Sequence, residues 1–290
     1  MMKAPEIFDN QQICRNRNRA APHFEAADFL KLIAVDRLKD RLDLIRRSFD
    51  KVIDIGAHGG YAARDLSSHE KIGSITSFDP AYAFVKQAAQ HGASHQMMVE
   101  ALPDDLSPCD AVVSLLYLHQ VNDLPKLMRQ MASLLNPDGL FFAILFGGRS
   151  LQELRASLAA AEEEVTGGMS AHVAPMADIK DVGGLLQHAG LAMPVADSEV
   201  ITVTYSSIFT LMKDLRLMGE GNALKGRLTH LSRREIFMRA AAIYQDRYGL
   251  DDGQIPATFE LISLTGWKPD KSQPQALRPG SAKSAITDLF

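Results

Sequence analysis

The stretch KVIDIGAHGGYAARDL, from Lys51 to Leu66, predicts a strand, a glycine-containing turn and a helix. Ligands of open parallel sheets bind outside the carboxyl ends of strands, where glycine permits close approach and helix N-termini present free N–H groups. Gly56 and Gly60 meet this requirement, but His58 stands where the usual G-x-G spacing has its second glycine. The stretch predicts either a nucleotide-type site or a plain structural turn. We expect the His58 imidazole to point toward solvent and to leave the site open.

Strand-like and helix-like segments alternate after this stretch, which indicates an α/β fold with parallel strands and crossover helices. The expected strands are VIDI, SITSF, HQMMVEA, AVVSLLYL and LFFAILF, followed by residues 200–205 and 258–265. An amphipathic helix is expected over 28–49, and later helices over 62–66, 81–90, 124–135, 150–165, 178–189, 208–218 and 232–247. Asn136-Pro137-Asp138-Gly139 predicts a sharp turn with positive φ at the glycine, from which the next strand begins.

The composition indicates an ordinary folded protein. The 290 residues are 46% hydrophobic, and the formal charge of −4 gives no global positive field for nucleic acid. Cys14 and Cys109 lack any paired spacing, so we expect neither a disulfide nor a zinc site. Since no apolar run is long enough for a membrane span, we expect a soluble, cytoplasmic protein without stable membrane insertion. We predict an N-terminal arm and helix over 1–49, a main domain over 50–268 and a flexible tail over 269–290.

Arg15, Arg17 and Arg19 form a short basic segment near the N-terminus. Such a segment resembles a weak mitochondrial targeting peptide, although Pro22 and nearby acids interrupt a long amphipathic helix. The other interpretation is a solvated arm that packs over the domain.

Asp79 ends the expected second strand, SITSFD, where a carboxylate can accept hydrogen bonds from ribose hydroxyls. The alternative is an N-cap, in which the Asp79 side chain accepts a bond from a free N–H of the next helix. Pro80 is expected to stop the strand and to open that helix.

Several motifs together resemble one known family. VIDIG with Gly60, FDP, DAVVSLLYLH and LNPDGLFFAILF look like class I S-adenosylmethionine (SAM) methyltransferases, which have a doubly wound, mostly parallel seven-stranded sheet with a helical lead-in. HQVNDLP, FGGRSLQELR, GGMSAH, DLRLMGEGN, PATFELISLTGWK and RPGSA narrow the resemblance to respiratory complex I assembly factors. Their mitochondrial members hydroxylate an arginine of a complex I subunit, and their bacterial relatives are usually labelled methyltransferases. The resemblance covers nearly the whole chain.

This resemblance implies a SAM site and a protein substrate. It assigns Asp54, Gly56 and Gly60 to the methionine and ribose end of SAM, Asp79 to the ribose, and residues 100–102 to the adenine. The complete set expected to bind the cofactor is Asp54, Gly56, Ala57, His58, Gly60, Asp79, Pro80, Glu100, Ala101, Leu102 and Ser114.

The chain departs from the family pattern at four positions: His58 replaces the middle glycine, Met98 an acid, Gln120 a tryptophan and Arg149 an acid. Because His58 and Met98 depart from the family pattern, a non-catalytic assembly factor that has lost SAM binding is an alternative interpretation.

His119, Asn122 and Asp123 follow the fourth expected strand and are the candidate catalytic residues. An imidazole such as that of His119 can act as a general base near neutral pH, and Asp123 is expected to orient it or to bind a cationic substrate group. The alternative is that Asn122 or Asp123 caps the helix that begins at Leu124.

Methyl transfer requires mainly positioning, so the absence of a nucleophile motif is expected. Hydroxylation commonly uses iron held by two histidines and a carboxylate, and no such spacing is evident, so we expect no metal site. The leading interpretation is a SAM-dependent methyltransferase acting on a protein, with arginine hydroxylation next. Gly147-Gly148 and Gly167-Gly168 predict loops over the cleft, and Glu162-Glu163-Glu164 a solvated helix face.

Overall fold

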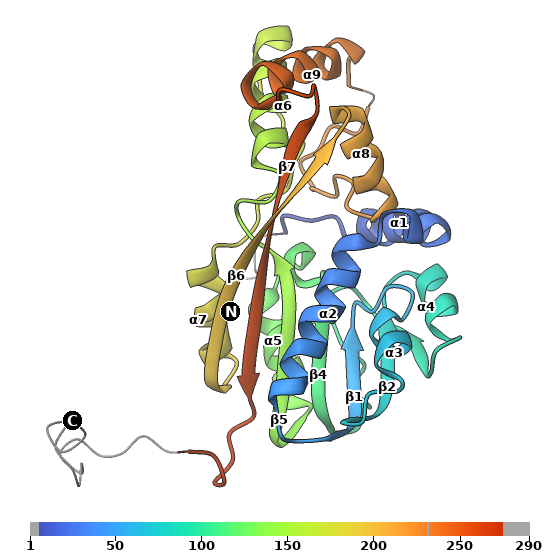
Figure 1. Cartoon of the computed structure of the whole chain (residues 1–290). Helices are drawn as coiled ribbons and strands as arrows, with labels where there is room; N and C mark the ends of the chain where they lie inside the picture. The colour runs from blue at the N-terminus through green and yellow to red at the C-terminus, as the bar shows by residue number, and fades with distance from the viewer. Residues whose placement is uncertain (1–5, 231, 275–290) are drawn as a thin grey trace, which may run out of the picture.

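Seven strands form one sheet in the order β3-β2-β1-β4-β5-β7-β6 (Figure 1). The structure is a computed structural model, and it describes residues 6–230 and 232–274. The strands are β1 (Phe49–Ile55), β2 (Ile72–Asp79), β3 (Ser94–Gln96), β4 (Cys109–Leu115), β5 (Leu135–Phe146), β6 (Ala192–Tyr205) and β7 (Ile255–Trp267). The first five strands are parallel, and β7 runs antiparallel to β5 and β6. The predicted doubly wound, mostly parallel seven-stranded sheet is confirmed.

The strand order reverses between β1 and β4. From β1 the chain proceeds outward through β2 to β3, and it then returns to place β4 on the other side of β1. The carboxyl ends of these two central strands therefore face a crevice, which is where open α/β sheets bind ligands.

Helices cover both faces of the sheet (Figure 1). They are α1 (Asn10–Ala20), the 3₁₀ helix η1 (Ala21–Ala27), α2 (Phe29–Leu44), α3 (Tyr61–Leu66), α4 (Tyr82–Ala88), α5 (Leu124–Ser133), α6 (Gln152–Thr166), α7 (Ile179–His188), α8 (Ile208–Leu217) and α9 (Arg234–Tyr248), with a short 3₁₀ turn η2 (Leu118–Gln120). Buried residues of α2 and α3 share one core cluster, and those of α5 and α7 share the other. Helical spacing creates each apolar stripe, as in α5, where Leu127 and Met131 are both buried.

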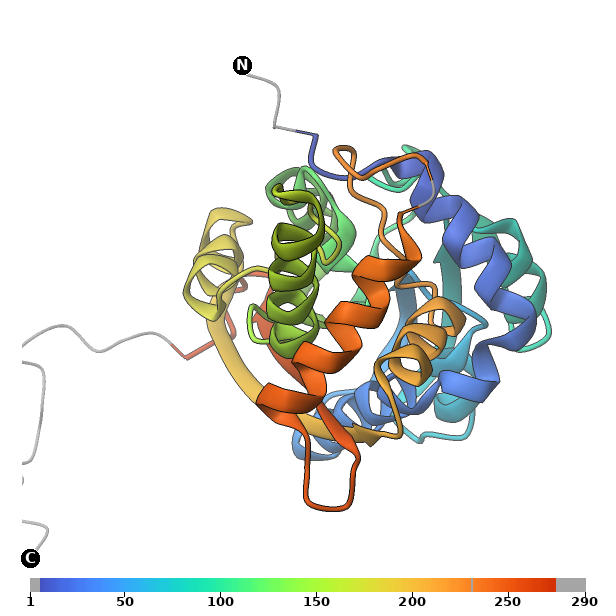
Figure 2. The same cartoon turned by 90° about the horizontal axis from the view of Figure 1, so that it is seen from above.

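The strands β6 and β7 extend beyond the carboxyl ends of the central strands. There α6 and α9 pack side by side, with α8 next to them, as Figure 2 shows from above. These three helices enclose space above the crevice, and residues 219–224 lead back from α8 toward it.

The N-terminal arm lies over the carboxyl ends of β1 and β2 (Figure 1). Asp9 caps α1 by accepting a hydrogen bond from the Gln12 N–H. Ile13 and Arg17 of α1 are buried, so the interpretation of this segment as a solvated arm is wrong at Arg17, which is only 1% exposed.

Three local predictions are wrong. The expected strand HQMMVEA shortens to β3, because only Ser94–Gln96 pairs with β2. Asn136-Pro137-Asp138-Gly139 lies within β5, at an irregularity of its pairing with β4, and the positive φ falls on Asp138. Pro80 does not open α4, which begins at Tyr82.

Residues 275–290 of the predicted tail lie outside the described residues, and the division into arm, main domain and tail stays a prediction. Among residues 6–230 and 232–274, no helix combines the length and apolarity that a membrane crossing requires.

Candidate functional site

The glycine turn after β1 has the backbone that the sequence predicts. Gly56 and Gly60 have φ of 74° and 78°, a region that favours glycine, and Gly60 precedes the first residue of α3. A Cβ on Gly56 would lie 2.2 Å from Cγ of Tyr117. The Tyr117 ring therefore fills the space directly against this turn.

Asp54 is a buried carboxylate without a partner. Among residues 6–230 and 232–274, neither oxygen has a hydrogen-bond partner, and burial raises the Asp54 pKa to about 6 even though the nearby Lys31 ammonium acts in the opposite direction. Burial likewise lowers the Lys31 pKa to about 8, and Lys31 Nζ donates to the Leu115 carbonyl at 2.9 Å. An unpartnered buried carboxylate beside a buried ammonium is suited to the charged groups of an amino acid. The Ser114 hydroxyl, in contrast to the Asp54 carboxylate, has a partner within the protein, since it donates to the Ile55 carbonyl at 2.7 Å.

Asp79 is the most heavily bonded group of the crevice. Oδ1 accepts from Arg17 Nε at 3.3 Å and from the Ala81 N–H at 2.9 Å. Oδ2 accepts from Arg17 Nη2 and from the His58 N–H at 2.9 Å. Asp79 thus accepts a hydrogen bond from a backbone N–H just before α4, which resembles the alternative role of an N-cap. The N-cap residue of α4 is nevertheless Ala81.

His58 points into the protein, so our expectation of a solvent-facing imidazole is wrong. The side chain is 2% exposed and lies against the rings of Phe24 and Phe84. Burial, together with the cations of Arg17 and Lys31, holds the His58 pKa well below its ordinary value, so the ring is neutral. Nδ1 lies 3.0 Å from the Gly56 carbonyl, which assigns the proton to Nδ1. Nε2 then accepts from Arg17 Nη1 at 3.2 Å.

The region expected to hold adenine borders a cavity of about 600 Å³. Its walls include Met98, Glu100 and Ala101, whereas Leu102 is buried in the core. Met98 is 74% exposed and therefore does not fill the crevice. Glu100 Oε1 accepts a bond from the Asn122 side chain.

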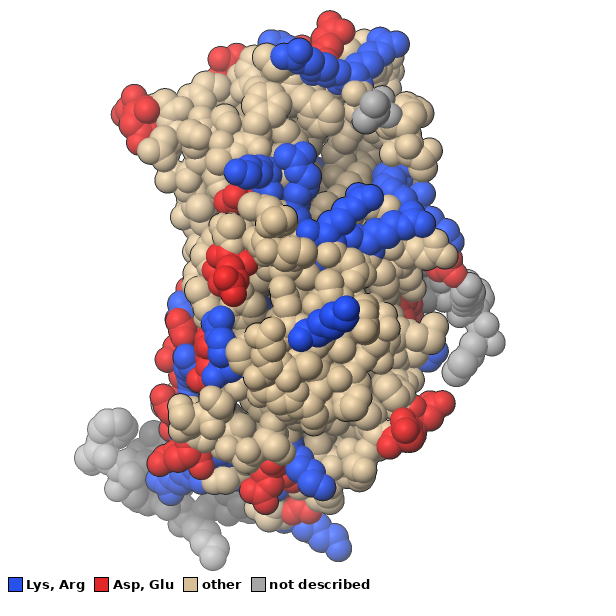
Figure 3. Space-filling model, turned by 90° about the vertical axis from the view of Figure 1, so that its right-hand side faces the viewer, with Lys and Arg blue, Asp and Glu red and all other residues tan. Residues whose placement is uncertain are grey.

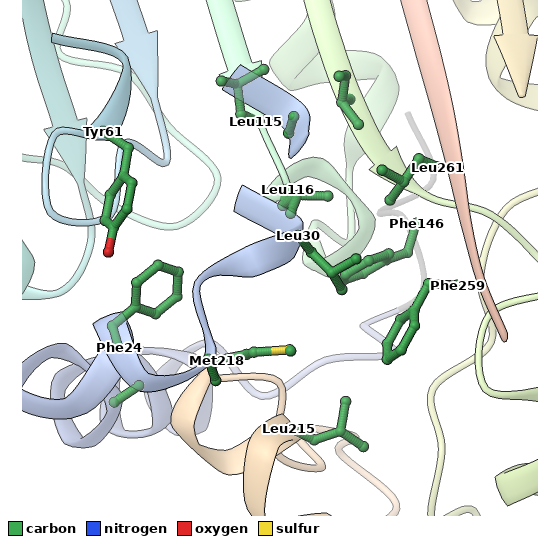
Figure 4. Packing of buried hydrophobic residues seen from close by; sticks show 14 of the residues in the cluster. Phe24, Leu30, Tyr61, Leu115, Leu116, Phe146, Leu215, Met218, Phe259 and Leu261 are labelled. Atoms are coloured by element: carbon green, nitrogen blue, oxygen red, sulfur yellow. The ribbon is translucent and has the colours of Figure 1, made fainter. Parts of the chain in front are cut away.

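The bonding partners and the free space of the crevice decide whether SAM fits. Asp54 at the methionine end fits a bound cation, but Tyr117 occupies the turn and Asp79 is fully engaged. The gap that remains between the arm and residues 218–220 measures about 10 Å³, which is at most the room of one water. Figure 4 shows how Phe24, Leu30, Met218 and Phe146 pack in this region. The crevice in this conformation does not accommodate SAM.

The three candidate catalytic residues separate into different roles. His119 Nε2 donates to Glu220 Oε2 at 3.1 Å, so Glu220 and not Asp123 orients the imidazole. Asp123 caps α5 by accepting from the Lys126 N–H at 3.0 Å, as the capping alternative predicts. Asn122 holds the N-terminal segment, because its Oδ1 accepts from the Phe8 N–H at 2.7 Å.

A second cavity, of about 230 Å³, lies beside the crevice. Most of its wall is apolar, and its polar groups include His119, Gln120 and Glu220. Gln120 Nε2 donates to Glu220 Oε2, while Gln120 Oε1 and His119 Nδ1 are buried and have no partner in the part of the chain that the structure describes. Glu220 and Phe146 line both this cavity and the gap beneath the arm. The two spaces are therefore neighbours that share a wall.

The predicted glycine loops lie near this cavity without lining it, although Ser150 and His172, which follow them in the chain, are part of its wall. Gly147 lies against Glu260, where a Cβ would meet Oε2 at 2.5 Å, and Gly167 ends α6 with positive φ. Glu162 is not part of a solvated face, since it is 4% exposed and accepts from the Ser170 N–H at 2.7 Å. Arg155 donates to backbone carbonyls of the surrounding loops, including that of Ser150 at 3.1 Å. In the part of the chain that the structure describes, no three His, Cys, Asp or Glu side chains gather as a metal site.

Sequence reasoning missed four residues of the site: Arg17, Lys31, Tyr117 and Glu220. Ile13, Arg17 and Ala20 recur at helical spacing, which is a signal for a buried face that includes Arg17. Glu220 lies in the segment GEGN, whose glycines indicated only a break between helices.

Comparison with known proteins identifies the family. Residues 8–193, more than half of the chain, match the family model described as Methyltransferase domain. Arginine-hydroxylase NDUFAF5 of Rattus norvegicus is 38% identical over 292 residues, which cover 99% of this chain and 84% of that protein. Malonyl-[acyl-carrier protein] O-methyltransferase of Nitrosospira multiformis is 32% identical, with 91% of this chain and 90% of that protein covered.

Solved structures share the fold at low sequence identity. The BH2331 protein of Bacillus halodurans has a TM-score of 0.56 at 15% identity, and the match covers 81% of this chain and 99% of that chain. The [4+2]-cyclase SpnF has a TM-score of 0.54 at 15% identity, with 93% and 99% covered. The chain therefore belongs to the methyltransferase domain family, whose cofactor is SAM, and within that family it is related to arginine-hydroxylase NDUFAF5.

Proposed function

We propose that this chain is a SAM-dependent enzyme that modifies a side chain of a protein substrate during the assembly of respiratory complex I. The observation that carries the proposal is the shared wall: Glu220 and Phe146 line both the family's cofactor crevice and the neighbouring cavity. A side chain placed in the cavity would lie next to the crevice, which is the arrangement that group transfer requires. The complex I part rests on the resemblance of the sequence to assembly factors of that complex.

The cavity suits a side chain with an apolar stem and a hydrogen-bond-donating head. Its wall is apolar along most of its length, and Glu220 supplies a carboxylate whose side chain is 10% exposed. Gln120 Oε1 and His119 Nδ1 lack partners among the described residues, but both atoms are buried, so Glu220 is the acceptor that the cavity offers. Arg216 also lines the cavity but is exposed, so solvent screens its charge more than that of Glu220. An arginine side chain meets these conditions.

Hydroxylation of the substrate arginine is the second candidate. It is favoured by the relatives named arginine-hydroxylase, of which the Homo sapiens protein is 37% identical over 98% of this chain. A non-catalytic assembly factor is the third candidate, and the closed crevice favours it.

Mass spectrometry of complex I subunits separates these candidates. The subunits would be compared between a deletion strain and the same strain carrying the parent chain, Glu220→Gln or the control Glu164→Gln. We expect a methyl group on one residue with the parent and the control, and a loss of at least about 100-fold with Glu220→Gln, comparable to about 3 kcal/mol of lost interaction with a charge. Glu164 is a suitable control because it is exposed and forms an ion pair with exposed Arg239, away from both cavities. One added oxygen in place of the methyl group would support hydroxylation, and assembly without either mass gain would refute an enzymatic role.

A further inference from the structure

Exposed cations gather on two neighbouring helices. We call them the cationic band, which consists of Arg15 and Arg19 of α1 together with Lys213 and Arg216 of α8. Residues three or four positions apart share a helix face, so the two cations of each helix point the same way. The helices α1 and α8 are in contact. Figure 3 shows Lys and Arg side chains gathered across the side of the molecule that carries α1 and α8.

The cationic band lacks acidic partners within the protein. Among residues 6–230 and 232–274, no ion pair joins any of its four cations to a carboxylate. Helix α1 contains no Asp or Glu, and the single acid of α8, Asp214, is less exposed than the two cations of that helix. In contrast, Arg37 and Arg41 of α2 pair with Glu199 and Asp197 of β6 at 2.6 and 3.3 Å. Like charges on one helix face repel, so carboxylates supplied by a partner would stabilise this surface.

The cationic band reaches the second cavity through Arg216. Arg216 is exposed and lines the cavity, whereas the Glu220 side chain in the same wall is 10% exposed. The cavity therefore has a positive charge at its rim and a negative charge inside. A cationic side chain that enters the cavity meets Glu220, while acids next to it in the chain meet the band. Both contacts are complementary in charge, and a basic segment would be repelled at the rim.

This surface suits carboxylates of a protein better than the phosphates of a nucleic acid or of a lipid surface. The cavity beside the band has a mostly apolar wall and the Glu220 carboxylate, so it would exclude a phosphate. The formal charge of −4 gives the whole chain no long-range attraction to a polyanion. The band therefore acts over the short distances at which a docked segment contacts it.

We propose that the cationic band binds an acidic segment of the substrate protein and thereby selects which side chain enters the second cavity. Asp or Glu residues near the modified side chain pair with the four cations of the band. The inference rests on the proposed function, because it takes a protein as the substrate. It adds the chemical character of the sequence around the modified residue.

Peptide binding to the full-length chain tests this inference. Fluorescence anisotropy would compare a synthetic peptide that has one arginine between two short runs of glutamate with the same peptide carrying glutamine in both runs. We expect the glutamate peptide to bind about tenfold more tightly, and we expect added NaCl to remove this advantage. Equal affinities of the two peptides for the parent chain would overturn the proposal without any variant.

Charge reversal locates the binding surface. The band variant combines Arg15→Glu, Arg19→Glu and Lys213→Glu, and it leaves Arg216 of the cavity wall unchanged. The control reverses three exposed cations on other parts of the chain: Arg46→Glu, Arg129→Glu and Lys180→Glu. We expect the folded band variant to bind the glutamate peptide about tenfold more weakly than the parent, and the control to stay within about twofold. An equal loss in both would contradict the proposal, because net charge alone would then explain binding.

Two other polyanions serve as competitors of the proposal. Vesicles that contain phosphatidylglycerol and a single-stranded DNA would be titrated with the parent and the band variant. Band-dependent binding of either one, without a preference for the glutamate peptide, would refute the proposal in favour of a lipid or nucleic-acid surface.

Failure of this inference is distinguishable from failure of the proposed function. In the deletion strain, a band variant that modifies complex I subunits as fully as the parent would refute the acidic segment and leave the proposed modification intact. Band-dependent binding of the glutamate peptide, in a strain where the parent adds no mass to any subunit, would support the docking surface and refute the modification.

Discussion

The aromatic ring of Tyr117 lies directly against Gly56, so that a Cβ on the glycine would be 2.2 Å from the ring. The Tyr117 hydroxyl donates to the Val99 carbonyl at 2.6 Å, which holds the ring from its far side. This contact links the glycine turn after β1 to the segment that follows β4. It makes the conformation of the crevice sensitive to a single methyl group.

Gly56→Ala is expected to lower the free energy of unfolding by about 3 kcal/mol or more, because it adds a clash to a left-handed backbone. Gly184→Ala is the matched control: Gly184 lies inside α7, and a Cβ there meets nothing within 4 Å. That variant should gain about 0.5–1 kcal/mol from its higher helix propensity. Urea denaturation would measure both, and equal stabilities would contradict the packing of Tyr117 on the turn.

Asp54→Asn is expected to stabilise the protein at neutral pH. The folded-state pKa of Asp54 is raised to about 6, so the parent loses stability as pH rises from the ordinary aspartate value to about 6. The variant has no carboxylate to ionise at this position. Its free energy of unfolding should therefore exceed that of the parent by about 3 kcal/mol above pH 6 and by nearly nothing below pH 4. Thermal melts of both proteins across pH 4–8 would show the two curves diverging. Parallel curves would mean that Asp54 has a partner when it is ionised.

Glu162 and Glu164 are expected to respond differently to the same change, although they belong to one acidic run. Glu162→Gln should cost about 1–3 kcal/mol, since the buried carboxylate accepts from the backbone and hydroxyl of Ser170 and from His172. Glu164→Gln removes an exposed pair with Arg239 and should cost less than about 1 kcal/mol.

The pH dependence provides a separate check on Glu162. Burial alone would raise the Glu162 pKa, but the bonds from Ser170 and the neighbouring His172 hold it below its ordinary value. Its stabilisation is therefore present above the ordinary glutamate pKa and is lost as pH falls through the lower folded value. Parent and Glu162→Gln should converge in acid, and a constant difference in Tm would argue against these bonds.

Asn122 and Asp123 are expected to affect different parts of the chain. Asp123→Ala removes the α5 cap and should lower global stability by about 1 kcal/mol. Asn122→Ala removes the bonds to the Phe8 N–H and carbonyl, so it should speed hydrogen exchange in residues 6–9. Exchange measured residue by residue would separate the two effects. Faster exchange along α5 in Asn122→Ala would contradict this assignment.

The central sheet could be predicted because its signals are local. The runs that became β1, β2, β4 and β5 are apolar and bounded by glycine or proline, so periodicity and turn chemistry sufficed. The full length of β6 could not be predicted, because the segment before Val200 contains Pro194, a residue that is rare inside strands, and is mostly exposed. Its strand conformation depends on pairing with β7, which lies far along the chain.

The site was predictable in its parts and not in its pairings. Asp79 and His119 were recognised from their positions after strands, but their partners, Arg17 and Glu220, lie 62 and 101 residues away in the sequence. His58 was expected at the surface because its burial depends on Arg17 and on rings contributed by other elements. Such pairs between distant charged residues form only in the folded chain, so local sequence patterns do not predict them.

The N-terminal arm also holds residues 219–224 in place through hydrogen bonds. Asn16 of α1 donates to the Gly221 carbonyl at 2.8 Å, and the Asp9 N–H donates to the Ala223 carbonyl at 2.8 Å. Both carbonyls belong to the segment that carries Glu220 into the second cavity. A molecule seated in that cavity would rigidify the segment and hold α1 down, while release of α1 would loosen it. Binding in that cavity and any displacement of α1 would therefore oppose each other, by the same coupling free energy in both directions.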